Sequence, residues 1–310
     1  MKVLVLGSGA GGGFPQWNCN CRLCAGQRQG EVDASARTQS SIAVSQDGQS
    51  WVLLNASPDI GQQIRSQPQL RPRSGLRDTP IKAVVLMDAQ IDHVTGLLSL
   101  REGPRIKLYA TPCVFEDLTT GLPLINVLQH YCGTRWHMLP VAGHQTSAEF
   151  AIAGFDTLRF TAIAIPGMAP PYSPHRREQV TGDNIALLIE DLATGQRLFY
   201  APGLADVGEQ ELQWMRRADC LLVDGTFWQE CEMRDAGLSA KTAREMGHLP
   251  QQCSDTRTGM AELIGALPAQ RKVLIHINNS NPILDQSSEQ RRVLHASGIE
   301  VAHDGMEILL

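Results

Sequence analysis

The chain has 310 residues, of which 43% are hydrophobic and 19% are charged, and its net charge is −5. This length can bury the core of one large α/β domain, and the slightly acidic balance argues against a nucleic-acid-binding protein. No apolar run approaches the roughly 18 residues of a membrane span, and the apolar stretch after Met1 is too short for a signal peptide. We therefore expect a cytoplasmic protein without a membrane span; its oligomeric state, including a homodimer, stays open.

The first half of the chain is predicted to pass from hairpin-like strands to strand–helix units. A strand at 2–6 and a hairpin at 41–54 come first. The continuous apolar run at 81–87 is typical of a strand buried on both faces, and it leads directly into an acidic, histidine-containing segment. The other elements predicted here are a helix at 59–66 with Asp59 as its N-cap, a helix at 94–100, a strand at 106–110, and helices at 112–118 and 122–131.

The second half repeats this order. Alternation at 158–165 predicts a strand, and the proline-rich segment 166–174 predicts a loop. No linker or low-complexity segment separates the halves, so we predict a single domain over residues 1–310 with internal pseudo-symmetry. The other elements predicted here are strands at 184–190, 198–201, 220–224, 272–276, 299–302 and 306–310, and helices at 209–217, 251–267 and 287–297.

A glycine-rich turn, Gly7 to Gly12, follows the first strand and matches the G-x-G-x-x-G pattern of dinucleotide-binding proteins. That interpretation requires a helix directly afterwards, whereas Gly13-Phe14-Pro15 follows, which is poor helix-forming sequence. We therefore favour a tight turn in which two backbone segments pass closely, with the option that it borders an active site.

Three of the eight cysteines lie within six positions, at Cys19, Cys21 and Cys24. In a cytoplasmic protein clustered thiols bind metal more often than they form disulfides, and this spacing lets three thiolates of one loop face a single tetrahedral Zn(II). We predict a structural zinc knot at about residues 18–25; unrelated buried cysteines and a redox C-x-x-C are the alternatives. The fourth ligand stays open between Asn279, His303 and a nearby aspartate.

Acidic and histidine side chains gather at the ends of three predicted strands, which is where α/β proteins place their chemistry. Taken alone, Asp92 could cap the following helix and His93 could be an ordinary core histidine. Their coincidence with further polar side chains at other strand ends favours a functional site. The side chains concerned are Asp88, Gln90, Asp92, His93, Asp224 and His276.

The segment Asp88-Ala89-Gln90-Ile91-Asp92-His93 resembles the H-x-H-x-D-H signature of the metallo-β-lactamase superfamily, and the cysteine pattern resembles its zinc-knotted phosphodiesterase branch. Over the whole chain, the glycine- and cysteine-rich start, DGTFW at Asp224, MGHLP at His248 and HINNSNPIL at His276 resemble a family of this superfamily that acts in synthesis of pyrroloquinoline quinone (PQQ). The resemblance implies an α/β fold in four layers, an αββα sandwich.

The resemblance also implies roles for single residues. Asp92, His93 and His276 match metal ligands of the superfamily. His248 matches a loop histidine that assists catalysis in the phosphodiesterase branch, and Asp224 matches an acid of that branch.

The chain departs from the superfamily at four ligand positions. Asp88 and Gln90 replace two histidines, Gly167 falls where the mid-chain metal histidine belongs, and Pro202 falls where the bridging aspartate belongs. A hydrolytic two-zinc site needs such ligands around a metal-bound hydroxide, so we expect that site to be lost.

Two histidines and one carboxylate remain, which is the ligand pattern of non-heme Fe(II) oxygenases. We predict Fe(II) at Asp92, His93 and His276, in addition to Zn(II) in the knot. Asp88 would add or orient a ligand, and His248 would move protons.

The resemblance and the remaining ligands leave three candidate functions. The first is an iron-dependent oxygenase that hydroxylates the tyrosine ring of a peptide-derived Glu–Tyr precursor of PQQ. The second is a carrier that binds PQQ or its precursor and aids its transport to the periplasm, and the third is a residual phosphodiesterase. Other PQQ-synthesis proteins are candidate partners, and Arg101, Arg176 and Arg177 are candidate contacts for a carboxylate-rich ligand.

Overall fold

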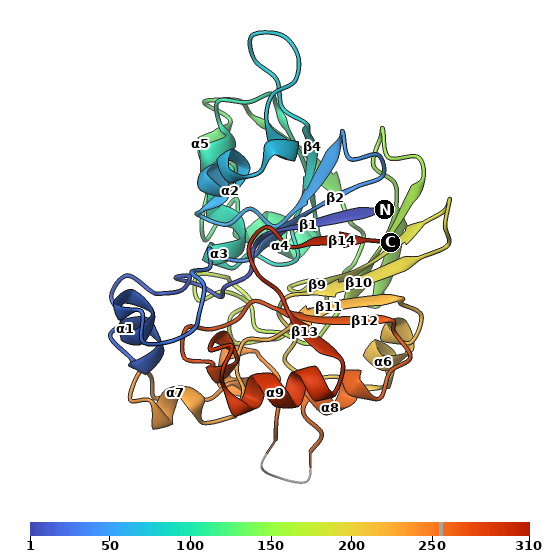
Figure 1. Cartoon of the computed structure of the whole chain (residues 1–310). Coiled ribbons are helices and arrows are strands. Elements are labelled where there is room, and N and C mark those ends of the chain that lie inside the picture. Colours follow the sequence, from blue (N-terminus) through green and yellow to red (C-terminus); the bar gives the residue numbers. More distant parts are fainter. Residues whose placement is uncertain (254–256) are drawn as a thin grey trace.

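The structure is a computed structural model that describes residues 1–253 and 257–310. Two seven-stranded sheets pack face to face, and helices cover the outer face of each sheet (Figure 1). The predicted four-layer αββα arrangement is therefore confirmed. In the described part of the chain, no helix combines the length and the apolar character needed to cross a membrane.

The first sheet has the strand order β14-β1-β2-β3-β4-β5-β6 and changes from antiparallel to parallel pairing at β3. Its strands are β1 (Lys2–Gly7), β2 (Ser41–Ser45), β3 (Trp51–Leu54), β4 (Ile81–Val85), β5 (Ile106–Ala110), β6 (Thr134–Met138) and β14 (Glu307–Leu309). The associated helices are α2 (Ile60–Ser66), α3 (Ile91–Val94), α4 (Pro112–Asp117) and α5 (Leu124–Leu128), with 3-10 turns at Pro68–Leu70 and Thr95–Leu100.

The second sheet has the order β13-β12-β11-β10-β9-β8-β7 and changes from antiparallel to parallel pairing at β10. Its strands are β7 (Ser147–Phe150), β8 (Leu158–Ala164), β9 (Ile185–Asp191), β10 (Arg197–Ala201), β11 (Cys220–Asp224), β12 (Arg271–Ile275) and β13 (Ile299–Val301). The helices on this side are α1 (Arg22–Gln29), α6 (Glu209–Met215), α7 (Glu232–Asp235), α8 (Met260–Gly265) and α9 (Glu289–Ala296), with 3-10 turns at Arg244–Met246 and Pro282–Leu284.

Strand β1 contributes side chains to two hydrophobic cores, one on each face of its sheet. Because successive side chains of a strand point to opposite faces, Val3 and Val5 pack between the sheets, whereas Leu4 and Leu6 pack under the helices of the first sheet. Burial of each such side chain contributes roughly 1.5–3 kcal/mol. Burial on both faces explains why the central strands read as continuous apolar runs.

Several predicted elements differ from the structure. The helix predicted at 251–267 is shorter, because α8 begins only at Met260 and the part of the prediction over 254–256 lies outside the described residues. Asp59 precedes α2 but makes no side-chain capping bond; its carboxylate instead accepts hydrogen bonds from the backbone and side-chain amides of Gln39 (2.9 and 3.0 Å). Helices α1 and α7 and strands β6 and β7 were not predicted.

Candidate metal centres

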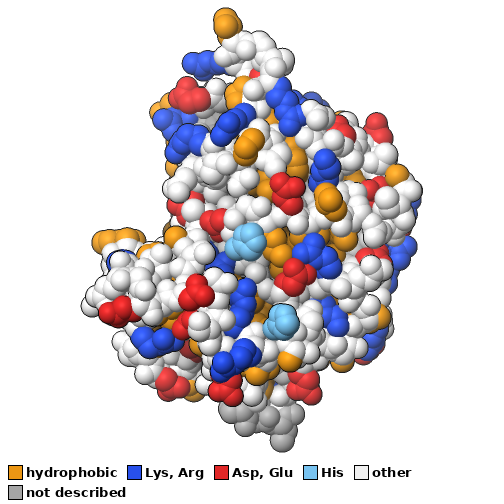
Figure 2. Space-filling view, in the orientation of Figure 1, with side chains coloured by type: hydrophobic (Ala, Val, Ile, Leu, Met, Phe, Trp, Pro, Cys, Tyr) orange, Lys and Arg blue, Asp and Glu red, His pale blue; other side chains and the backbone are white. Residues whose placement is uncertain are grey.

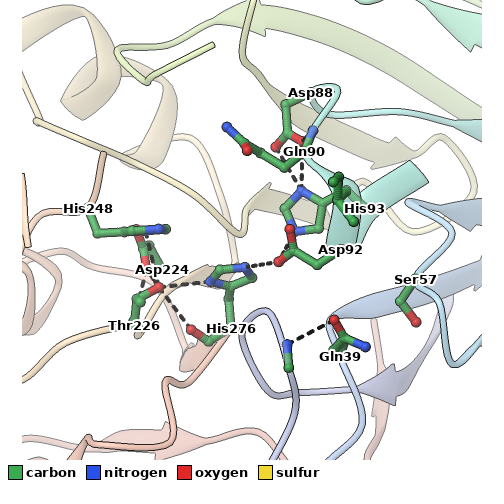
Figure 3. Close-up of polar contacts among 12 residues, drawn as sticks. Gln39, Ser57, Asp88, Gln90, Asp92, His93, Asp224, Thr226, His248 and His276 are labelled. Atoms are coloured by element: carbon green, nitrogen blue, oxygen red, sulfur yellow. Dashed lines mark hydrogen bonds and ion pairs between the residues drawn. The ribbon is translucent and has the colours of Figure 1, made fainter. Parts of the chain in front are cut away.

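The ends of three parallel strands bring the predicted site residues together (Figure 3). Strand β4 is followed by Asp88 and by helix α3, which carries Asp92 and His93. Strand β11 ends at Asp224, and β12 is followed directly by His276. Strands β11 and β12 are parallel neighbours in the second sheet and end at the same edge of it. Strand β4 belongs to the first sheet, and the segment after it meets the segment after β12 across the sandwich, so that Asp92 and His276, 184 residues apart in sequence, come into contact.

The backbone at His276 is unusual. Its φ angle is +62°, the left-handed region that non-glycine residues rarely adopt. The next residue is fixed to the glycine-rich turn, because Ile277 N donates to Ser8 O and Ala10 N donates to Ile277 O, both at 2.9 Å. Strained backbone of this kind persists where the surroundings over-determine it, and it gathers at functional sites.

The glycine-rich turn is the tight turn favoured from the sequence, and no dinucleotide-type helix follows it, since the next helix begins only at Arg22. Ala10 and Gly11 line the cavity of the site. A Cβ placed on Gly11 would lie 3.3 Å from Asp92 Oδ2, so glycine lets this turn approach the carboxylate closely.

Asp92, His93 and His276 form a cluster whose ligand atoms all lie within 4.8 Å of one another. Asp92 Oδ2 is 3.2 Å from His276 Nε2 and 3.9 Å from His93 Nε2. His93 and His276 are buried, and the Asp92 carboxylate is only partly exposed.

His93 is held by Asp88, both of whose carboxylate oxygens lie 2.8 Å from His93 Nδ1. The Nδ1–H therefore donates to Asp88, which leaves Nε2 as the nitrogen that can face a cation. This Nε2 atom is buried and has no hydrogen-bond partner among the described residues, although buried polar atoms are rarely left unpaired. A cation between Nε2, the Asp92 carboxylate and His276 would satisfy it, so the donor set fits a divalent metal.

The carboxylates also control protonation at the cluster. Burial opposes a charged His93, but Asp88 and Asp92 outweigh it and raise the pKa of His93 to about 9. Burial would raise the pKa of Asp92, yet His93 and His276 hold it well below its usual range. A site that stabilises a proton on buried imidazole with two carboxylates stabilises a metal cation in the same way.

Asp224 belongs to a second cluster with His248 and His276, but its oxygens are already in use. Oδ1 accepts from the backbone amide (2.9 Å) and the hydroxyl (2.5 Å) of Thr226, while Oδ2 accepts from Leu204 N (2.9 Å) and is 2.6 Å from His248 Nδ1. Asp224 is fully buried and has no free oxygen directed at the cavity. Its geometry suits the positioning of His248 rather than metal ligation.

Thr226 connects the two clusters. Its hydroxyl donates to Asp224, so its oxygen accepts from Nδ1–H of His276 at 2.8 Å. That bond leaves His276 Nε2 with its lone pair toward Asp92, as a metal ligand requires. Thr226 was not predicted from the sequence, although it lies two residues after an acid at the end of a strand, which could have indicated it.

His248 lines the cavity from the segment after the 3-10 turn Arg244–Met246. Its ring stacks on His276 with a centroid distance of 5.3 Å. Burial opposes its charged form, but Asp224 outweighs burial and raises the pKa of His248. The imidazole can therefore hold a proton at Nε2 beside the metal cluster.

The three clustered cysteines converge as predicted. The sulfur atoms of Cys19, Cys21 and Cys24 lie within 4.8 Å of one another. Cys21 occupies the N-cap of α1, where its sulfur accepts from Cys24 N at 3.5 Å. Burial raises the pKa of Cys24 to about 11, so a cation is needed to keep this sulfur as the thiolate that binds zinc.

Of the candidates for a fourth zinc ligand, only Asn279 contacts the cysteines in the described part of the chain. Its side-chain amide is 3.4 Å from Cys24 Sγ, and its backbone carbonyl oxygen is 3.8 Å from Cys21 Sγ. His303 instead contacts the backbone of its neighbour Asp304. Among the described residues, no aspartate or glutamate joins the three sulfurs.

The metal cluster opens into a cavity of about 250 Å³. Of the three arginines proposed as ligand contacts, Arg176 lines this cavity, whereas Arg101 and Arg177 do not. Arg101 instead lies over the Tyr131 ring. Lys241 also lines the cavity and was missed, because an isolated lysine in a loop gives no sequence signal.

One face of the molecule carries charged side chains of both signs. Lysine and arginine side chains are interspersed with aspartate and glutamate on the face shown in Figure 2.

Comparison with known proteins places these features in context. A model of the β-lactamase superfamily domain matches residues 50–277. Coenzyme PQQ synthesis protein B from Ectopseudomonas mendocina is 56% identical over 100% of both chains. The protein of the same name from Methylococcus capsulatus is 53% identical, again over 100% of both chains.

Solved structures of similar fold include a member of the same family as these relatives. A crystal structure of Zn(2+)-bound PqqB from Methylobacterium extorquens has a TM-score of 0.87 and 38% identity, and the match covers 100% of each chain. A diphosphatase of the PhnP family has a TM-score of 0.63 at 18% identity, covering 99% of this chain and 96% of that one, which shows a shared fold alone.

Proposed function

The chain belongs to the coenzyme PQQ synthesis protein B family within the β-lactamase superfamily, and on that premise we propose that it is an iron-dependent oxygenase of PQQ biosynthesis. Its substrate would be a peptide-derived Glu–Tyr precursor, hydroxylated on the tyrosine ring. One atom of O2 enters a ring C–H bond. The other leaves as water, with two electrons and two protons from an external reductant.

The observation that carries the proposal is the ligand set. Asp92, His93 and His276 supply one carboxylate and two imidazoles, and the buried Nε2 of His93 has no hydrogen-bond partner among the residues that the structure describes. Fe(II) on such a set keeps open positions and supplies oxygen activation when bound. In the zinc knot the donors are thiolates, which suit Zn(II).

The chain's own groups would prepare the site for this chemistry. Asp88 fixes the ring of His93, and Thr226 fixes the ring of His276. His248, held by Asp224, can take or return a proton at Nε2 within the cavity.

A hydrolytic two-metal site is disfavoured by the residues that replace the usual ligands. Gly167 and Pro202 offer no side-chain donor, and both oxygens of Asp88 are directed at His93. The side-chain amide of Gln90 is already engaged, since its Nε2 donates to Met168 O at 2.9 Å. The second metal of a dinuclear hydrolase would therefore lack ligands.

The direct test is turnover with iron-loaded protein, the dipeptide Glu–Tyr, O2 and ascorbate. We expect oxygen consumption and a product heavier by one oxygen atom, with both signals lost in His93→Ala and His276→Ala. His303→Ala, an exposed histidine outside the site, is the matched control and should keep wild-type turnover. Lack of oxygen uptake by the iron-loaded wild type would contradict the proposal.

The alternative function is a carrier that holds PQQ or its precursor and aids transport to the periplasm. The cavity and the incomplete metal motif favour it as the second candidate. A carrier should keep most of its PQQ affinity in the His93→Ala and His276→Ala variants, measured by fluorescence titration, and should show no turnover in the wild type.

A further inference from the structure

Two chemically different sets of side chains line the cavity. One is the cluster of Asp92, His93 and His276, and the other consists of two cationic side chains, Arg176 and Lys241, which come from segments between regular elements. We propose that these two side chains bind a carboxylate of the ligand and so direct its reacting part toward Asp92, His93 and His276. The inference rests on the proposed function for the identity of the ligand but not for its charge.

Arg176 comes from the long segment between β8 and β9 and is half-buried. One nitrogen of its guanidinium donates to the backbone carbonyl of Ala169 in the same segment. That bond fixes the direction of the side chain and leaves further N–H groups free. A guanidinium fixed in this way is well suited to a carboxylate, because its planar set of donors matches the two oxygens.

Lys241 comes from a different segment, between α7 and the 3-10 turn Arg244–Met246. Its ammonium has no hydrogen bond or ion pair with any residue that the structure describes. Glu245 lines the same cavity, and its carboxylate accepts from Thr242 N at 2.7 Å and lies 3.3 Å from Arg234. The hydrogen bond from Thr242 N lowers the pKa of Glu245 and the charge of Lys241 adds to this effect, but the ammonium makes no close contact with that carboxylate. Lys241 is thus available to an anionic ligand.

Asn184 is a third polar residue of the cavity, and its position is linked to that of Gly167. A Cβ on Gly167 would lie 2.4 Å from Asn184 Cγ, so no side chain fits at that position unless Asn184 moves. Asn184 lines the cavity, and its buried Nδ2 has no hydrogen-bond partner. The position that offers a metal histidine in the resembling superfamily is therefore filled by a hydrogen-bond donor that a ligand oxygen can satisfy.

The test compares ligands that differ in charge alone. Anaerobic calorimetric titration of the iron-loaded protein would use Glu–Tyr and its fully amidated counterpart, Gln–Tyr-amide. We expect the wild type to bind the acid at least tenfold more tightly. Arg176→Gln and Lys241→Gln should each weaken binding of the acid about tenfold, the range of a charge-assisted hydrogen bond, and change that of the amide less than twofold.

Arg177→Gln is the matched control, because Arg177 is the exposed neighbour that does not line the cavity, and it should bind both ligands as the wild type does. Thermal midpoints of all variants show that they are folded. Equal affinity of the wild type for acid and amide, or equal losses for both ligands in the variants, would overturn the inference even if the protein hydroxylates. Charge-dependent binding without hydroxylation would support it while the proposed oxygenase function fails.

Discussion

Asp88 controls the ring of His93 without facing the metal position itself. Its carboxylate takes the place of a superfamily metal histidine, and both of its oxygens contact Nδ1 of the ligand. Such an arrangement fixes the tautomer and increases the basicity of the ligating nitrogen. The residue was predicted to add or orient a ligand, and its contacts favour orientation.

Asp88→Asn should therefore weaken Fe(II) binding about 10- to 100-fold, because the amide keeps an acceptor for Nδ1–H but loses the negative charge. Anaerobic titration with Fe(II) measures the affinity. Asp156→Asn, at an exposed aspartate, is the control. Unchanged affinity in Asp88→Asn would show that His93 is oriented by something else.

Glu232 is a half-buried acid outside the metal cluster. Burial raises its pKa to about 7 from an ordinary 4.5, although Ser280 and the Trp228 amide donate to its carboxylate. Because the folded pKa is above the unfolded one, the stability from protonated Glu232 is fully present below pH 4.5. It is lost as the pH rises through 7.

We expect wild type to lose on the order of 1–3 kcal/mol of unfolding free energy from this group between pH 4.5 and 8. Glu232→Gln should remove that part of the pH dependence, since the amide can still accept from Trp228 N. Urea unfolding of both proteins at pH 5 and pH 8 measures the difference. Parallel pH profiles would refute the assignment.

At the scale of elements, the segment that follows β12 links the two proposed metal centres. It begins with the ligand His276, continues to Asn279 at the cysteines, and ends at Asn281, whose side-chain amide donates to Gly225 O at 2.8 Å and Thr226 O at 3.1 Å. One short loop thus contacts the zinc knot, the glycine-rich turn and the end of β11.

Cys21→Ser should accordingly lose about one zinc per chain and lower the unfolding free energy, because structural zinc contributes to folding. It should also weaken Fe(II) binding, since the loop that carries His276 loses its contact with a rigid knot. Cys132→Ser, at a half-buried cysteine outside the cluster, should do neither. Wild-type zinc content in Cys21→Ser would contradict the zinc knot.

At the scale of the whole molecule, one core joins the two sheets. Phe160 is fully buried in it and stacks on Phe150 with a centroid distance of 5.3 Å. We propose that the chain unfolds as one unit. Phe160→Ala should cost roughly 3–5 kcal/mol and lower a single calorimetric transition, whereas Leu192→Ala, at an exposed position, should have little effect. Two separate transitions would contradict a single domain.

Much of this architecture could be predicted because burial on both faces leaves a plain pattern. Strands β4 and β11 read as apolar runs, and the acids at their ends mark the site. Edge strands β6 and β7 escaped prediction because their half-exposed residues show no such pattern. The left-handed backbone of His276 and the hydrogen bonds that occupy both carboxylate oxygens of Asp224 depend on contacts between residues far apart in sequence. Local sequence patterns do not encode such contacts.

The central claim is that the chain holds two metals of different character. Elemental analysis of protein purified without oxygen tests it most directly. We predict about one zinc and one iron per chain in the wild type, with His276→Ala losing the iron and keeping the zinc. Loss of zinc instead of iron in His276→Ala, or a wild type that takes up zinc alone when iron is supplied, would contradict the account.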